Sequence, residues 1–338
     1  MNPSSIADAR TGVRALRGDA GLTLIELLVV VFLLGLLAQA AVLASAGALE
    51  EAQQQTTQQT LAQLETALLG QPQRLDSLGR PNYGGFVADV GGLPVHRGGD
   101  AAAALRELWM QPGAIAATPD PDGLRSVAGF ALQTTVLDAD VRLACGWRGP
   151  YLRLGVGVAA LRDGWGNAYL PFDRAGMASV LGGEIAAVLS YGADGQAAGT
   201  GYAADLSLLL EASSTVLSPM PVAARQSGDV TVHVQTLPSG GDVLVVRVYG
   251  PVTGPVAGTL GLMKKAERSP TGIPFTPGDP VVVTLAGVPI GPRALRAYQT
   301  TAVPLDTDPV PAGPRSPVLP ITVEPYAIQP LQLTIQGS

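Results

Sequence analysis

A glutamate at the head of a long apolar run constrains this 338-residue chain more than any other feature. Glu26 follows a short charged leader, and from Leu27 to Leu49 no side chain is ionisable. That run is longer than the ~20 apolar residues that a helix needs to cross a bilayer core. A carboxylate at membrane depth costs about 2.5 kcal/mol or more, so it is usually paired or functional. The N-terminus therefore predicts a membrane-spanning helix whose carboxylate has a specific partner.

The junction before this run is Gly21-Leu22-Thr23-Leu24-Ile25-Glu26, and it resembles the leader junction of type IV pilins and type II secretion pseudopilins. The resemblance implies that prepilin peptidase cuts after Gly21 and methylates Leu22, a position where the family more often has Phe. It also implies that Glu26 pairs with the N-terminal amine of another subunit during assembly. A signal anchor or a secretory signal peptide is the alternative, but a secretory signal has a shorter apolar core of about 7 to 15 residues.

The leader and the apolar run together predict where the chain lies. The leader carries Arg10, Arg14 and Arg17 against Asp8 and Asp19, so its net charge is +1 and that of the mature chain is −7. Basic loops stay cytoplasmic, so we expect a single-pass protein whose leader is cytoplasmic and whose bulk faces the other side. The resemblance implies that this membrane is the inner membrane, that the head is periplasmic or extracellular, and that the chain is assembled into a filament. The resemblance implies three partners: prepilin peptidase, other pilin or pseudopilin subunits including copies of the chain, and an inner-membrane assembly platform. The acidic chain has no basic cluster, so no nucleic-acid partner is expected.

The chain is predicted to be an α+β protein in four parts. Residues 1–21 form the cleaved leader, and residues 22–70 form one long helix with 22–49 in the membrane or the filament core. Residues 71–217 form a globular head, and residues 222–338 form a further β-domain. A charged fraction of only 14%, with 42 glycines and 28 prolines, favours turns and short strands after the helix.

An apolar face at helical spacing predicts the second half of the long helix. Thr57, Leu61, Leu64 and Leu68 recur at i, i+4, i+7 and i+11, which places them on one side. Gly70 then stops the pattern. This face is expected to pack on the head.

Three segments of the head resemble the major pseudopilin of type II secretion. Gly149–Leu152, Asp163–Tyr169 and Ser190–Gln196 match its Gly-Pro-Tyr-Leu, Asp-Pro-Trp-Gly-Asn-x-Tyr and Ser-x-Gly-x-Asp-Gly elements, in the same order. Gly164 replaces the usual proline, and the linking segments are longer than in that family. With the apolar run Ile185–Tyr191 as a buried strand, these elements predict a small antiparallel sheet with tight turns.

The remaining part of the head carries weaker local signals. A helical piece is predicted around Ala101–Trp109, with Asp100 as its N-cap. Phe130–Val136 and Val141–Leu143 are candidate strands.

Composition changes after a proline-containing linker at Ser218–Val222. Seven short β-prone runs at this spacing predict an all-β, immunoglobulin-like sandwich. The runs are Val230–Leu237, Asp242–Tyr249, Gly258–Met263, Val281–Leu285, Ala294–Gln299, Leu319–Val323 and Leu331–Ile335. The proline-rich segment Asp306–Pro314 is expected to be an exposed loop or extended segment, because each proline removes a ladder donor.

Asp194 and Asp205 are the candidate metal ligands. In the major pseudopilin, a loop after the matching aspartate-glycine turn wraps a calcium ion with carboxylates and backbone carbonyls, so the resemblance implies calcium here. Calcium takes about 6 to 8 oxygen ligands, which suits a glycine-rich loop that turns its carbonyls inward. The alternative is a hairpin turn at Asp194 and a surface or capping role for Asp205.

Catalytic signals are weak, and the chain is not expected to be an enzyme. His96 and His233 fall in different predicted domains, no Gly-x-Ser-x-Gly elbow is present, and Cys145, the only cysteine, reads as a small buried residue. The leading hypothesis is a structural subunit of a type II secretion pseudopilus or a type IV pilus-like filament. The alternatives are a minor pilin that displays its β-domain as an adhesin or partner-binding module, and a membrane-anchored extracytoplasmic hydrolase.

Overall fold

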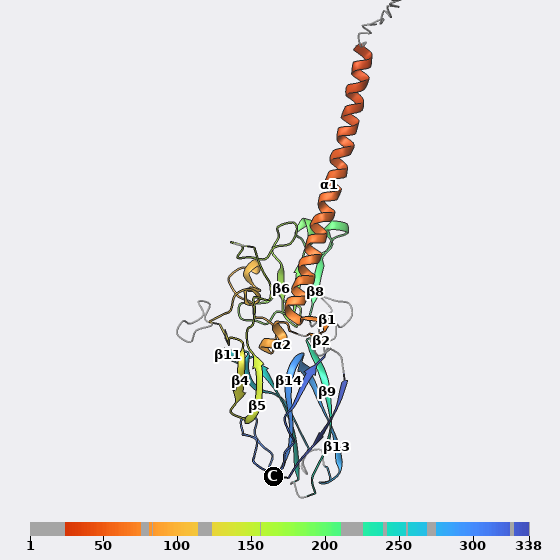
Figure 1. The fold of residues 1–338 in the computed structure, drawn as a ribbon. Helices are drawn as coiled ribbons and strands as arrows, with labels where there is room; N and C mark the ends of the chain where they lie inside the picture. Colours follow the sequence, from red (N-terminus) through yellow and green to blue (C-terminus); the bar gives the residue numbers. More distant parts are fainter. Residues whose placement is uncertain are drawn as a thin grey trace, which may run out of the picture. The chain divides into compact units, whose positions relative to one another are not determined.

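The computed structural model describes residues 24–75, 81–82, 84–113, 124–155, 157–210, 226–238, 242–254, 256–268, 275–324 and 328–337. The chain divides into two compact units, Met1–Glu50 and Glu51–Ser338. The described part is α+β, with a long N-terminal helix followed by many strands in several sheets (Figure 1). The predicted fold class is therefore confirmed.

The helix α1 spans Leu24–Leu69, close to the predicted bounds. Within the described residues it is the one helix long and apolar enough to cross a membrane. Its last turns bury the predicted face, with Thr57, Leu64 and Leu68 fully buried. The helix ends at Gly70, whose φ of +84° lies in the left-handed region and stops the helical backbone. Glycine adopts this conformation at little cost because it has no Cβ.

The head consists of short elements packed around the C-terminal turns of α1 (Figure 1). Its core joins residues of α1 and α2 with residues of the later strands. The elements are β1 (Gln71–Leu75), β2 (Pro81–Asn82), α2 (Phe86–Val90), β3 (Ser126–Val127), β4 (Ala131–Thr135), β5 (Asp138–Cys145), β6 (Leu170–Phe172), β7 (Ala187–Ser190) and β8 (Leu206–Leu209), with four 3₁₀ turns at Ala101–Ala103, Arg106–Leu108, Gly192–Asp194 and Gly201–Ala203.

The helix predicted around Ala101–Trp109 is instead two separate 3₁₀ turns. Its predicted N-cap is confirmed, because the Asp100 side chain accepts a hydrogen bond from the backbone N–H of Ala103 at 2.9 Å. Leu105 breaks the run with a non-helical backbone between the turns. The helix propensity of the alanines is therefore not enough to form an α-helix here, since tertiary packing determines the backbone conformation of so short a segment.

The C-terminal region holds two sheets that share one apolar core. A four-stranded sheet has the order β12-β10-β14-β15, and a three-stranded sheet has the order β13-β9-β16. Their strands are β9 (Ser227–Gln235), β10 (Val243–Val252), β12 (Thr259–Arg268), β13 (Pro280–Pro289), β14 (Gly291–Thr300), β15 (Leu319–Val323) and β16 (Ile328–Thr334). The short strand β11 (Val256–Ala257) pairs instead with β3 of the head. Alternate residues of both sheets, such as Val232 and Val246, meet in one buried cluster. All seven predicted runs fall on strands, and an immunoglobulin-like topology stays a prediction.

The hairpin β4–β5 packs on the four-stranded sheet although it lies far away in the sequence. Val141 and Cys145 of β5 join a buried cluster with Tyr249 of β10 and Ala294 of β14. Gln133 of β4 adds a polar link, because its amide donates to the Gly258 carbonyl and accepts from the Leu260 N–H. Side chains of the head therefore pack directly against the C-terminal sheets within the unit Glu51–Ser338.

The proline-rich segment is only partly exposed, because it lies over one face of β10. Arg247 is fully buried there, and its guanidinium donates to the carbonyls of Leu305 and Asp308 at 3.0 and 2.6 Å. Val310 donates its backbone N–H to the Leu137 carbonyl at 2.7 Å. The prolines predicted an exposed loop or an extended segment outside the sheet ladders, and the segment lies over β10 in this way.

Candidate functional site

The predicted processing and assembly residues lie near or before the N-terminal limit of the described residues. Gly21 and Leu22, the predicted processing residues, lie outside the described residues. Glu26 lies in the first turn of α1 with an exposed side chain. A carboxylate is favoured at this end of a helix, because the unpaired N–H groups of the first turn carry partial positive charge. Large apolar side chains from Leu24 to Leu37 are exposed along the following turns.

In the head, the Asp163 carboxylate organises the tight turn that the Trp-Gly-Asn motif predicted. One of its oxygens accepts the backbone N–H groups of Trp165 at 3.0 Å and of Asn167 at 2.7 Å. The other oxygen accepts the Ser190 hydroxyl at 2.7 Å. Asn167 in turn donates its side-chain amide to the Gly192 carbonyl at 3.0 Å. The second and third motifs are therefore brought together by direct side-chain contacts.

This turn also lies directly against helix α1. The Gly164 N–H donates to Thr57 Oγ1 at 2.9 Å, and the Tyr169 hydroxyl reaches the Thr57 carbonyl at 3.4 Å. A Cβ on Gly164 would lie only 2.0 Å from the Gln53 carbonyl oxygen. Proline at this position would clash in the same place and would lack the N–H that bonds to Thr57. The local packing against α1 therefore favours glycine at position 164.

The first motif lies elsewhere, between α2 and the 3₁₀ turn at Arg106–Leu108. Tyr151 donates its backbone N–H to the Leu108 carbonyl at 2.8 Å, and its hydroxyl donates to the Asp89 carboxylate at 3.0 Å. Arg148 forms an ion pair with the same carboxylate at 3.0 Å. Burial raises the pKa of Asp89 to about 6, and the Arg148 charge opposes part of that rise. Burial and the neighbouring Asp89 charge also raise the pKa of Tyr151.

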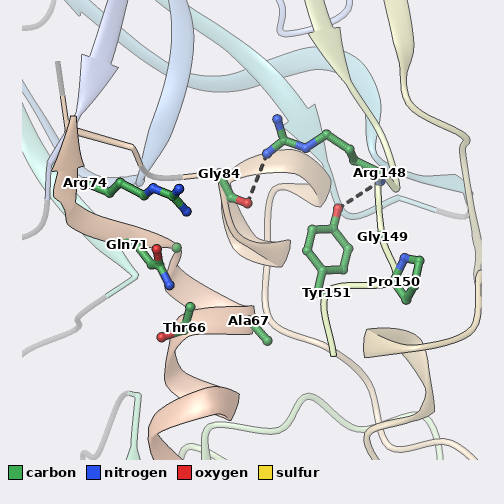
Figure 2. Close-up of a pocket in the computed structure, with 10 residues that line it drawn as sticks. Thr66, Ala67, Gln71, Arg74, Gly84, Arg148, Gly149, Pro150 and Tyr151 are labelled. Carbon is green, nitrogen blue, oxygen red and sulfur yellow. Dashed lines mark hydrogen bonds between the residues drawn. The ribbon is translucent and has the colours of Figure 1, made fainter. Parts of the chain in front are cut away.

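A cavity of about 420 Å³ opens beside this motif at the C-terminal end of α1. Figure 2 shows Arg74 and Arg148 entering it from opposite sides, with Arg148 donating to the Gly84 carbonyl at 3.0 Å. Its lining residues are Thr66, Ala67, Gly70, Gln71, Arg74, Gly84, Arg148, Gly149, Pro150 and Tyr151. The cavity is polar and positively charged, which suits an anionic group rather than an apolar one.

Asp194 and Asp205 flank a glycine-rich loop, as predicted. Asp194 accepts the Gln196 N–H at 3.0 Å, and Asp205 accepts the Ala198 N–H at 3.1 Å. Both are exposed, and Ala198 adopts a φ of +68°, so the loop is tightly turned. No group of three or more His, Cys, Asp or Glu side chains placed to hold a metal occurs among the described residues. A calcium ion here would need carbonyl oxygens of the loop besides the two carboxylates.

The remaining sequence candidates are placed separately. His96 Nδ1 donates to the Ser179 carbonyl at 2.7 Å, whereas His233 is exposed on β9. Cys145 is buried at the end of β5, where desolvation raises the pKa of its thiol to about 12. Such a thiol is not activated as a nucleophile.

Sequence reasoning missed several buried charged groups. Glu107 is fully buried and forms ion pairs with Arg97 at 2.8 Å and Arg125 at 2.9 Å. Arg293 of β14 is also fully buried, and its guanidinium donates to the Ala88 carbonyl at 2.9 Å. These contacts join residues that are 10, 18 and 205 positions apart, so no helical or strand period signals them.

Comparison with known proteins gives one match, and it lies at the N-terminus. Residues 16–42 match the prokaryotic N-terminal methylation motif, which is the signal of type IV pilins and pseudopilins. No curated protein and no solved structure matches the chain. The matched residues contain the Gly21 junction, Glu26 and much of the apolar run. The chain therefore carries a type IV pilin-like N-terminus of the kind that prepilin peptidase processes.

Proposed function

We propose that the chain is a structural subunit of a pilus-like filament, of the secretion-type pseudopilus branch, that assembles through its N-terminal helix. The match to the N-terminal methylation motif over residues 16–42 carries this proposal. The three head motifs add support for the secretion-type branch, because Asp163 and Ser190 join two of them by a direct hydrogen bond. The inner-membrane assembly platform would extract the subunit from the membrane, and the apolar helix would enter the filament core.

The mechanism that we propose for assembly uses Glu26. Its carboxylate would pair with the N-methylated amine of Leu22 on another subunit, inside a bundle of apolar helices. A lone charge in such an environment is strongly disfavoured, and a partner of opposite charge offsets that penalty. The pairing would therefore fix how far one helix enters beside the next.

Substitution of Glu26 tests this mechanism. Glu26→Ala is expected to leave leader removal intact and to lower the amount of the subunit in sheared filaments. Glu51→Ala is the matched control, because Glu51 is an exposed glutamate on the same helix beyond the apolar run. Normal filament incorporation of Glu26→Ala would contradict the mechanism.

A second candidate role is a minor subunit whose C-terminal β-region binds a partner or acts as an adhesin. The apolar core between the two C-terminal sheets favours it, since these sheets bury a cluster made of their own side chains. The abundance of the chain in sheared filaments decides between the roles. A major subunit would dominate the filament, whereas a minor subunit would be present in small amounts.

A further inference from the structure

The cavity at the C-terminal end of α1 continues into a second one along the same helix. The second cavity has a volume of about 350 Å³ and is lined by Ala62, Gln63, Thr66, Gln71, Tyr151, Leu152 and Arg153. The two cavities share Thr66, Gln71 and Tyr151, so they form one groove. We call it the α1 groove. It follows the helix from Ala62 to Gly70, which suits an extended segment of chain rather than a compact small molecule.

The charge of the α1 groove differs from that of its surroundings. Among the described residues, its lining includes Arg74, Arg148 and Arg153 but no Asp or Glu. Residues 22–218 hold 18 acidic and 10 basic side chains, so three arginines together are a local exception. Arg148 is partly neutralised by Asp89. In the described part of the chain, the exposed side chains of Arg74 and Arg153 form no ion pair.

We propose that the α1 groove binds an extended acidic peptide segment of another subunit of the assembly. Guanidinium groups hold carboxylates through paired N–H donors, and three of them along one groove match carboxylates spaced along a strand. Gln63 and Gln71 supply neutral donors and acceptors for the backbone of such a segment. This inference rests on the proposed function, and it adds the chemistry of one subunit contact.

Stabilisation of the C-terminal end of α1 is an alternative role for the arginines of the groove. The last turn of this helix carries no basic residue, and the carbonyls of a helix C-terminus attract cations. Arg74 and Arg148 line the cavity at that end of the helix (Figure 2), so this role would account for their position. Arg153 lines only the second cavity, which is lined by earlier turns of the helix, so helix-end stabilisation does not account for it.

A peptide-binding measurement tests the proposal. The mature full-length chain in detergent micelles would be titrated against fluorescein-labelled hexaglutamate and hexaglutamine, with anisotropy as the readout. We expect saturable binding of hexaglutamate, weaker binding at high salt, and none of hexaglutamine. Arg153→Gln should weaken hexaglutamate binding a few-fold, and the double variant R74Q/R153Q roughly fivefold or more, without loss of the folded state.

The matched control is Arg142→Gln, because Arg142 is an exposed arginine on β5 and does not line the α1 groove. Equal binding of both peptides to the unchanged chain would overturn the proposal. So would an equal loss in Arg142→Gln, or an R153Q variant that is fully folded and binds as the unchanged chain does. Failure of the wider function has a different readout, since Glu26→Ala affects filament incorporation and leaves hexaglutamate binding unchanged.

Discussion

Gly164 donates its backbone N–H to the Thr57 hydroxyl at 2.9 Å, which joins the tight turn of the head to helix α1. The contact is close because glycine has no side chain, and the Gln53 carbonyl occupies the space where a Cβ would be. Thr57 is fully buried on the same helical face as Leu64 and Leu68. The helix that is proposed to assemble the filament is therefore fixed to the head at this point.

Replacing Gly164 by alanine should destabilise the head. The new methyl group would lie 2.0 Å from the Gln53 carbonyl oxygen, so backbone must move. Overpacking of this kind costs about 1–3 kcal/mol, which should appear as a lower denaturation midpoint of the mature chain in detergent. Gly99→Ala is the control, because no atom lies within 4 Å of its Cβ position and the change should be small. Equal midpoints for the two variants would contradict the close contact.

The pKa of Asp89 predicts a pH dependence of stability. Its pKa is raised from 3.8 to about 6 in the folded chain, so between these values the folded state binds the proton more tightly than the unfolded state. The contribution of Asp89 to the free energy of unfolding should therefore be greatest below pH 4. It should decline as pH rises to about 6 and stay constant above, by about 3 kcal/mol in all.

Asp89→Asn provides the comparison for this prediction. Asparagine keeps an acceptor for the Tyr151 hydroxyl but does not titrate. The difference in unfolding free energy, unchanged chain minus variant, should fall between pH 4 and pH 6. A difference that stays flat over this range would show that the carboxyl titrates normally.

Arg296 and Asp138 couple the hairpin β4–β5 to the C-terminal sheet. Arg296 Nη1 lies 2.5 Å from Asp138 Oδ1, and both side chains are buried. Arg296→Met should cost about 3–5 kcal/mol in chemical denaturation, because it leaves a buried carboxylate without its partner. Adding Asp138→Asn should recover part of that loss. Arg315→Gln, which removes an exposed pair with Asp140 at 3.5 Å, should cost less than about 1 kcal/mol. If the losses in unfolding free energy of Arg296→Met and Asp138→Asn simply add in the double variant, the two residues are not coupled.

The loop between Asp194 and Asp205 predicts stabilisation by calcium. A cation beside two carboxylates would reduce their repulsion and order the tight turn at Ala198. Chelator should lower the melting temperature of the mature chain, and added calcium, but not magnesium at the same concentration, should restore it. Asp205→Asn should remove most of this response. An unchanged melting temperature in chelator would leave Asp194 and Asp205 as turn residues only.

Local pattern predicted the elements that periodicity defines. The spacing of Thr57, Leu61, Leu64 and Leu68 gave the buried face of α1, and alternation gave the C-terminal strands, since burial of one face requires these periods. Element ends were less accurate, as with β14, which extends to Gly291 and Thr300 beyond the predicted run. Ladder pairing continues past the apolar residues there, so hydrophobicity does not mark the ends.

Contacts between distant segments were not predictable. The α1 groove combines residues of the helix end with Tyr151 and Arg153, and no local signal joins them. The short helix α2 was missed as well, because its five residues are too few to show a helical period. The hydrogen bond between Ser190 and Asp163 was predictable only in part, because the sequence identified both motifs but not the contact between them.

The mass of the mature N-terminus tests the central claim most directly. Filament-associated or membrane-extracted protein would be digested, and its N-terminal peptide identified by mass spectrometry. The account predicts a chain that begins at Leu22, with one methyl group on its α-amine. An intact leader, a cut after the apolar run, or an unmethylated Leu22 would contradict processing by prepilin peptidase and with it the proposed assembly through Glu26.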